Sequence, residues 1–171
     1  MDVIELSAEL MALSARTAPK TLGQDFIETK IITGEDLKKL NNDMCKYGEE
    51  SKKKNFDRDG RNVEKSGAVL LISLNNPKRS GLNCGACGYN KCENLRDFRE
   101  GSEFAGPVCA WRLIDLGIAI GSAVKTASIL NVDNRVMYRI GISARRLKLI
   151  EGEIVVGIPL SATGKNIYFD R

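Results

Sequence analysis

Four cysteines close together limit what this chain can fold into more than any other feature of its sequence. Cys84, Cys87, Cys92 and Cys109 follow the spacing C-x2-C-x4-C-x16-C, and glycines lie between them. The fifth cysteine, Cys45, lies far from the others along the chain. A loop that carries four thiolates takes its shape from the group that they bind, so the first question is what that group is.

Four cysteines can form disulfides, a zinc site or an iron–sulfur cluster. Disulfides belong to oxidising compartments, and the opening residues Met-Asp-Val-Ile-Glu lack the basic and apolar regions of an export signal. Structural zinc favours two separate pairs of Cys or His ligands, whereas here three cysteines are bunched and the chain has no histidine. An iron–sulfur cluster takes thiolates from one loop and from a distant cysteine. We therefore predict an iron–sulfur cluster, with zinc and disulfides as alternatives.

The glycines of the loop suit such a cluster. Gly81, Gly85 and Gly88 have no Cβ, so the backbone can adopt positive φ and direct N–H groups at sulfur. Hydrogen bonds of this kind help to set the reduction potential. Positive charge beside the loop would favour the reduced cluster and steer an acidic partner. Three cations flank the loop: Lys78, Arg79 and Lys91.

Composition indicates an ordinary soluble domain. The 171 residues carry a net charge of +4, and the basic residues are scattered, so nucleic-acid binding is not expected. The most apolar stretch, residues 111–130, contains Arg112, Asp115 and Lys125 and predicts a buried helix, not a membrane span. Thiolates that bind a metal must stay reduced, which predicts a cytoplasmic protein.

Hydrophobic periodicity predicts an α/β sandwich around one sheet. The expected helices cover residues 2–16, 37–47, 93–100, 111–130 and 143–149, and the expected strands cover residues 25–33, 68–74, 135–140 and 153–160. The continuous apolar run at 68–74 predicts a strand buried on both faces. We predict one domain over residues 1–171, with a cluster-binding insert at 78–111.

Several side chains carry more detailed expectations. Leu6, Leu10 and Leu13 repeat at helical spacing and predict one face of the first helix. Residues 57–60 predict a surface turn. Gly117 and Gly121, four residues apart, predict tight packing of their helix on the sheet. Inside the helix expected at 93–100, Leu95 and Phe98 point inward. The Ile167-Tyr168-Phe169 stretch is expected to dock on the domain.

The cysteine spacing resembles a known module. It is similar to the four-cysteine 4Fe–4S domain of the corrinoid iron–sulfur protein, in which a C-G-x-C-G-Y-x-x-C segment precedes a last cysteine. The resemblance implies that Cys84, Cys87, Cys92 and Cys109 bind one 4Fe–4S cluster. That family has proline directly after the last cysteine, whereas this chain has Ala110 there and Pro107 before it.

A second resemblance covers the remainder of the chain. Residues 15–25, ARTAPKTLGQD, are similar to the A-x-x-A-P-S-x-x-N segment of flavin-dependent nitroreductases, with Lys20 and Gly23 in place of the serine and asparagine. The order of elements is also similar, and it implies a nitroreductase-like mixed sheet flanked by helices. Over nearly its full length the chain resembles a family of ferredoxin-domain-containing proteins that has the A-R-T-A-P-K, C-G-A-C-G and I-P-L-S-x-T-G-K-N-I-Y-F-D-R stretches.

The nitroreductase resemblance implies an FMN site and a homodimer. The chain lacks the R-x-S-x-R arm that holds the FMN phosphate in nitroreductases, so other residues would have to hold it. Candidates for contacts with the phosphate are Arg16, Thr17, Lys20, Thr21, Lys165 and Arg171.

Three functions follow from these patterns. The first is a 4Fe–4S protein that passes single electrons to a redox partner protein or a small-molecule acceptor. The second is an oxidoreductase in which the cluster supplies electrons to FMN. The third is a zinc-stapled binding module without catalytic activity. No catalytic residue is predicted, because the chain has no histidine and no Ser/His/Asp set.

Overall fold

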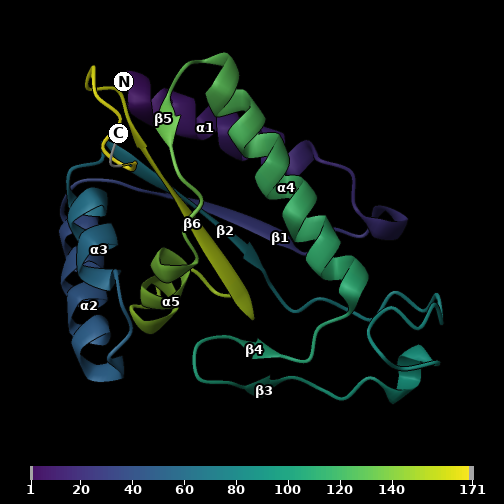
Figure 1. Cartoon of the computed structure of the whole chain (residues 1–171). Helices are drawn as coiled ribbons and strands as arrows, with labels where there is room; N and C mark the ends of the chain where they lie inside the picture. Colours follow the sequence, from purple (N-terminus) through teal and green to yellow (C-terminus); the bar gives the residue numbers. More distant parts are fainter. Residues whose placement is uncertain (1, 170–171) are drawn as a thin grey trace.

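The computed structural model describes residues 2–169 and places a four-stranded sheet between two layers of helices (Figure 1). The strands lie in the order β1 (Ile27–Ile32), β2 (Ala68–Leu74), β6 (Ile154–Ser161) and β5 (Asp133–Asn134). The predicted α/β sandwich is confirmed. One detail differs, since every pairing in this sheet is antiparallel, whereas a mixed sheet was predicted.

β2 is the centre of the sheet. It pairs with β1 on one side and β6 on the other, and all seven of its side chains are buried. Leu70 and Ile72 pack in the cluster beneath the first helical layer, while Val69 and Leu71 pack in the cluster of the second. Its alternate side chains thus reach two separate apolar cores, which explains the unbroken apolar run in the sequence.

The first layer consists of α1 (Val3–Thr17) and α4 (Ala110–Ile129). Asp2 caps α1, because its Oδ1 accepts a hydrogen bond from the Ile4 N–H at 2.8 Å. Ser14 Oγ and Thr126 Oγ1, 2.6 Å apart, join the two helices. Small and flexible side chains form the faces that meet the sheet: Ala8, Met11, Ala12 and Ala15 of α1, and Ala119, Ala123 and Ala127 of α4.

The outer face of this layer carries apolar side chains. Leu6, Leu10 and Leu13, predicted to share one face of the first helix, are 42%, 38% and 58% exposed. Gly117 and Gly121 are also exposed, and nothing lies within 4 Å of the place where their Cβ atoms would be. The prediction that these two glycines pack tightly on the sheet is therefore wrong. The close packing comes from the alanines of α4, on the opposite side of the helix.

The second layer contains α2 (Glu35–Ser51), α3 (Phe56–Glu64) and α5 (Tyr138–Arg146). The predicted turn at residues 57–60 is wrong, since these residues lie inside α3. Asp59 is buried there because Arg58 binds its Oδ1 at 2.8 Å and Arg139 binds its Oδ2 at 2.8 Å. A charged stretch can therefore be helical and inward-facing when arginines from two helices pair with its buried carboxylate.

α5 replaces two predicted elements. Residues 135–140 were expected as a strand, but only Met137 bridges the sheet, to Gly157, before the helix begins. The predicted helix at 143–149 begins at Tyr138 instead. Gly141 explains how close α5 lies to β6, since a Cβ atom there would be 1.7 Å from the Val155 carbonyl oxygen.

Residues 75–109 connect β2 to α4 and are called the connecting segment here. They form an irregular loop, a 3-10 turn η2 (Cys92–Asn94) and a hairpin of β3 (Arg99–Glu100) and β4 (Ala105–Gly106). The predicted helix at 93–100 is wrong, because the chain turns once and then enters the hairpin. Leu95 is buried as predicted, whereas Phe98 is exposed.

The C-terminal stretch docks as expected. Tyr168 is buried, with its hydroxyl 2.8 Å from Ser66 Oγ, and Ile167 and Phe169 pack against the second core. Among residues 2–169, none of the helices has the length and apolar character needed to cross a membrane.

Candidate metal centre

Cys84 and Cys87 lie in the irregular loop of the connecting segment and Cys92 begins η2, in the part of the chain drawn at the lower right of Figure 1, next to the first turn of α4. As predicted, the loop glycines have left-handed backbones: φ is 76° at Gly81, 74° at Gly85 and 88° at Gly88. Asn83 also has a positive φ, of 49°. A Cβ atom would meet nothing within 4 Å at the three glycines, so their role is conformational freedom.

Asn83 and Cys92 hold the loop closed. The Asn83 N–H donates to Cys92 Sγ at 3.3 Å, and the Cys92 N–H donates to Asn83 Oδ1 at 2.8 Å. Cys84 is exposed, while Cys87 and Cys92 are half-buried. The loop thus places one cysteine sulfur where a backbone N–H already points at it, which is the environment of a cluster thiolate.

The fourth predicted ligand is brought to the same place by α4. Cys109 precedes the first turn of the helix, and its Sγ lies 3.6 Å from Ser80 Oγ, at the start of the loop. Trp111, one residue into α4, donates its indole N–H to Cys84 Sγ at 3.2 Å. The start of α4 therefore contacts the cysteine loop at two points, one through Cys109 and one through Trp111.

Cys109 is also electrostatically distinct. Burial alone raises the pKa of the Cys109 thiol, but hydrogen bonds from Ser80 and from the backbone of the first turn of α4 outweigh it. The pKa of Cys109 is therefore lowered from its ordinary value. Donors that stabilise a thiolate also prepare a sulfur for metal binding.

A buried ion pair fixes this end of α4. Arg112 and Asp115 lie 3.2 Å apart with almost fully buried side chains. Arg112 donates to the Lys78 carbonyl at 2.9 Å and to the Thr21 carbonyl at 3.0 Å. The Arg112 guanidinium also stacks on the Phe26 ring, 4.7 Å from its centre. The pair thus ties the start of the connecting segment to α4 and to the segment after α1.

Sequence reasoning used Arg112 and Asp115 only as evidence against a membrane span. A better signal was present, because residues 112, 115, 116, 119, 123 and 127 follow one helical face. Two opposite charges three residues apart on an otherwise apolar, alanine-rich face indicate a buried pair. That face is the one that packs on the sheet.

The donor types of the loop fit an iron–sulfur cluster, because each thiolate of a cubane binds a different iron. Among residues 2–169, no group of three or more Cys, Asp or Glu side chains is arranged to hold a metal ion. Cys84 and Cys92 already accept N–H groups, as cluster sulfurs do. Their role as ligands, with Cys87 and Cys109, stays a prediction.

A cavity of about 330 Å³ opens beside Cys109. Its apolar side chains are Pro77, Leu95, Phe98 and Pro107, and its cations are Lys78, Arg79 and Arg96. Of the three cations predicted to flank the loop, Lys78 and Arg79 line this cavity. Lys91 does not, and its Nζ lies 3.6 Å from the Glu93 carboxylate instead. Asp97 also lines the cavity and pairs with Arg79 at 2.8 Å, so three cations and one carboxylate lie on this side of Cys109.

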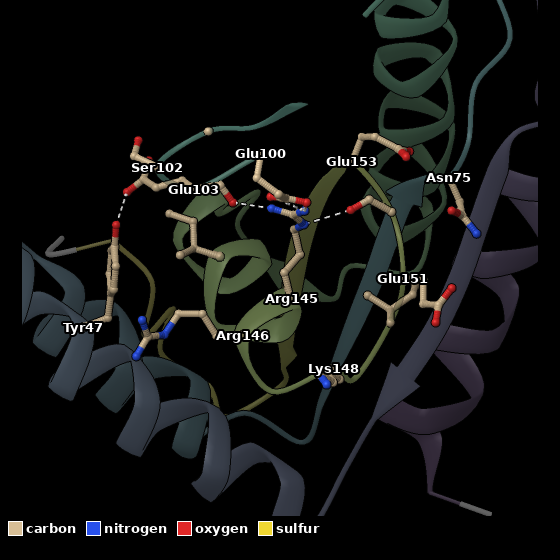
Figure 2. Close-up of a pocket in the computed structure, with 14 residues that line it drawn as sticks. Tyr47, Asn75, Glu100, Ser102, Glu103, Arg145, Arg146, Lys148, Glu151 and Glu153 are labelled. Atoms are coloured by element: carbon tan, nitrogen blue, oxygen red, sulfur yellow. Dashed lines mark hydrogen bonds and ion pairs between the residues drawn. The ribbon is translucent and has the colours of Figure 1, made fainter. Parts of the chain in front are cut away.

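A larger hollow of about 660 Å³ lies between the β3–β4 hairpin and the second helical layer (Figure 2). Figure 2 shows Arg145 pointing at the hairpin, where it donates to the Glu103 carbonyl at 2.6 Å and to the Glu100 carboxylate at 2.9 Å. It also donates to the Gly152 carbonyl at 2.8 Å. Sequence reasoning missed this site, which holds the hairpin against the end of α5 through charges already paired within the chain.

Comparison with known proteins identifies the family. The sequence profile of a family described as "uncharacterized protein containing a ferredoxin domain" matches residues 105–171. A protein of Archaeoglobus fulgidus, described as "uncharacterized protein", is 47% identical over 169 residues, which cover 98% of this chain and 91% of the relative. This chain belongs to the ferredoxin-domain family.

Solved structures show the same fold at low identity. A nitroreductase with bound FMN from Desulfitobacterium hafniense has a TM-score of 0.63 and 13% identity, covering 96% of this chain and 80% of the other. A nitroreductase family protein from Clostridium novyi has a TM-score of 0.58 and 16% identity, over 98% and 80%. The NADPH:FMN oxidoreductase from Vibrio harveyi has a TM-score of 0.60 and 12% identity, and this chain covers only 63% of its length. The ferredoxin-domain chain therefore has a nitroreductase-like fold.

The predicted flavin residues lie in two places. Arg16 and Thr17 end α1, and Lys20 and Thr21 follow, the latter in a 3-10 turn η1 (Thr21–Gly23). Lys165 follows β6, whose end pairs beside Ala68 near the opposite end of α1. Within one chain, the structure therefore does not bring Lys165 to the other four. Arg171 lies outside the described residues.

The polar groups near the end of α1 are already engaged. Arg16 pairs with the Asp25 carboxylate at 3.0 Å, and Lys20 lies 3.8 Å from the same carboxylate. The hydroxyl and N–H of Thr21 both donate to Asp115 Oδ1 at 2.8 Å. A phosphate would have to compete with two carboxylates here. That these residues bind a flavin phosphate stays a prediction.

Proposed function

We propose that this chain is an iron–sulfur redox protein in which Cys84, Cys87, Cys92 and Cys109 bind one 4Fe–4S cluster. The observation that carries the proposal is the contact of the first turn of α4 with the cysteine loop, through Cys109–Ser80 and Trp111–Cys84. It brings the helix that begins beside Cys109 against the loop that carries the other three cysteines, up to 25 positions away in the sequence. The family's ferredoxin domain supports the same conclusion. Residues 78–111 then form the cluster-binding insert of a single domain.

When bound, a 4Fe–4S cluster accepts and donates single electrons. The residues of the chain set the conditions for it. Gly85 and Gly88 adopt the positive φ that the turns of the cysteine loop require. Asn83 fixes the position of Cys92 through a hydrogen bond from the Cys92 N–H. Lys78, beside Cys109, would stabilise added negative charge, whereas the charge of Arg79 is partly offset by its pair with Asp97.

The direct test is anaerobic reconstitution with iron and sulfide. The expected protein is brown, binds about four iron and four sulfide per chain, and gives an EPR signal after one-electron reduction. Cys109→Ser should lose this signal, whereas Cys45→Ser should keep it, because Cys45 lies in α2, away from the loop. One equivalent of zinc without sulfide would reject the proposal in favour of a zinc-stapled module.

A flavin-dependent reductase is the second candidate. It is favoured by the fold, since nitroreductases from Bacteroides fragilis and Desulfitobacterium hafniense hold FMN on this architecture. In this arrangement the cluster would supply electrons to the flavin for reduction of a small substrate. Protein purified with FMN in the medium should then retain the yellow cofactor after desalting. Loss of all FMN from fully folded, cluster-loaded protein would leave electron transfer to a redox partner or small acceptor as the function.

We further propose that two copies pair through the outer face of α1 and α4. Leu6, Leu10 and Leu13 of α1 and Ile114 and Ile118 of α4 are all exposed. Exposed apolar side chains on two neighbouring helices favour an interaction site there. Light scattering should give twice the chain mass of 18.8 kDa, and Leu10→Glu should give monomers.

The reducing conditions that the thiolates need make the cytoplasm the proposed location.

A further inference from the structure

Within residues 2–169, Trp111 is the one residue whose side-chain N–H donates a hydrogen bond to a cysteine sulfur. Its Nε1 lies 3.2 Å from Cys84 Sγ, within the distance of an N–H···S hydrogen bond. The other N–H donor to a cysteine sulfur in the loop, at Cys92, is the backbone of Asn83. A side chain can be replaced without rebuilding the loop, so the contribution of Trp111 can be measured separately.

The position of the indole is fixed by a rigid element. Trp111 lies in the first turn of α4, between the predicted ligand Cys109 and the buried Arg112. Arg112 is anchored to the Lys78 and Thr21 carbonyls, so this turn cannot shift easily relative to the body. The indole is 37% exposed, and thus one side of it faces water while the N–H faces the sulfur of the exposed Cys84.

We propose that Trp111 is a positioning residue that raises the reduction potential of the cluster by donating its indole N–H to Cys84. This inference rests on the proposed function. One-electron reduction places additional negative charge on the ligand sulfurs, and an N–H dipole directed at sulfur stabilises that charge. Because Cys84 is the exposed cysteine of the loop, water would otherwise be its main hydrogen-bond donor, without a fixed geometry.

The test compares four anaerobically reconstituted proteins: wild type, Trp111→Phe, Trp111→Ala and Leu113→Ala. Phenylalanine keeps an aromatic ring and loses the N–H, whereas alanine loses both. Leu113 lies two positions along α4 and is similarly exposed, and its side chain has no hydrogen-bond donor, so its variant is the matched control. Each protein is titrated electrochemically, with the reduced cluster followed by EPR.

At a fixed potential, Trp111→Phe should lower the ratio of reduced to oxidised cluster by about three- to tenfold, or about 28 to 59 mV at 59 mV per tenfold for one electron. Trp111→Ala should shift the ratio in the same direction by at least as much. Leu113→Ala should stay within about twofold of wild type. Pulsed EPR in deuterated water should show a coupled exchangeable proton in wild type that is missing from Trp111→Phe.

Several outcomes would overturn the inference. A Trp111→Phe protein with the wild-type potential, beside a shifted Trp111→Ala, would mean that the ring acts only by excluding water. Equal potentials in all four proteins would remove any role of Trp111 in tuning. Failure of the wild type to assemble a cluster is a different result, because it rejects the proposed function itself.

Discussion

The body of the domain and the connecting segment are stabilised by different means. The body has two apolar cores on opposite faces of the sheet, and its central strand is completely buried. The connecting segment, residues 75–109, has few buried side chains: Pro77, Ser80, Leu95, Ala105 and Cys109. It is held at particular points instead, by Arg112 at its start, by Asn83 within the loop and by Arg145 at the hairpin.

This difference indicates that the body provides the stability of the fold and that the connecting segment provides the candidate ligands. Burial of apolar surface supplies most of the folding free energy, so we expect the body to fold without a metal. A segment with little apolar burial is ordered by polar contacts and, when a cluster is present, by metal–thiolate bonds. The proposed cluster would then be a cofactor bound to an already stable domain, not the core of the fold. The following predictions test this comparison, from the largest expected effect on the body to the smallest.

Arg112→Gln should have the largest effect, because it leaves Asp115 as a buried charge without its partner. We expect the free energy of unfolding to fall by about 3–5 kcal/mol. Chemical denaturation followed by circular dichroism measures this. The matched control is Arg61→Gln, which breaks an exposed pair with Asp57 and should cost at most about 1 kcal/mol. Similar losses in both variants would show that the buried pair does not join the two regions.

Leu71→Ala should destabilise the body by about 2–5 kcal/mol, because it leaves a cavity in the second core. The loss should be the same with and without a cluster, since Leu71 is remote from the cysteine loop. Leu82→Ala, in the exposed part of that loop, should change the free energy by less than about 0.5 kcal/mol. Thermal melts of cluster-loaded and cluster-free protein provide the comparison. If Leu71→Ala destabilised only the cluster-loaded protein, the prediction would be wrong.

Arg145→Gln should loosen the hairpin and leave the body folded. It removes the bonds to Glu100 and Glu103, and a cost of about 1–3 kcal/mol is expected for local opening. Hydrogen exchange should show it as lost protection of the Gly101 and Ala105 N–H groups, which bond within the hairpin and to Glu153. Arg146→Gln is the control, because Arg146 pairs with Asp43 and does not contact the hairpin. Unchanged exchange in Arg145→Gln would mean that the hairpin holds itself.

Cys92→Ser should have the smallest effect on the body. Iron and sulfide binding should be lost, while the free energy of unfolding of the cluster-free protein changes by less than about 0.5 kcal/mol. Iron analysis checks the loss of the cluster, and denaturant titration of the same sample checks the free energy of unfolding. If the substitution unfolds the entire chain, the metal is structural and the contrast between the two regions fails.

Sequence reasoning succeeded where one local pattern leads to one structure. The apolar run at 68–74 predicts β2 with its observed bounds, and the small-residue pattern from Trp111 predicts α4. Sequence reasoning failed where contacts with residues distant in the sequence determine the local structure. Alternation around Val136 and Tyr138 resembles a strand, but Gly141 permits a helix to approach β6 closely. Asp59 looks like a surface residue until Arg58 and Arg139 are placed around it.

The candidate site divides in the same way. Spacing and residue type alone predicted the glycines with positive φ, and the structure confirms them, because backbone freedom is a local property. The four cysteines as cluster ligands stay a prediction from their spacing and chemistry. Only the tertiary structure placed Trp111 on Cys84, buried the Arg112–Asp115 pair and gathered Lys78 and Arg79 beside Cys109. These contacts join residues far apart along the chain. They depend on how α4 packs on the sheet, and no local pattern encodes that packing.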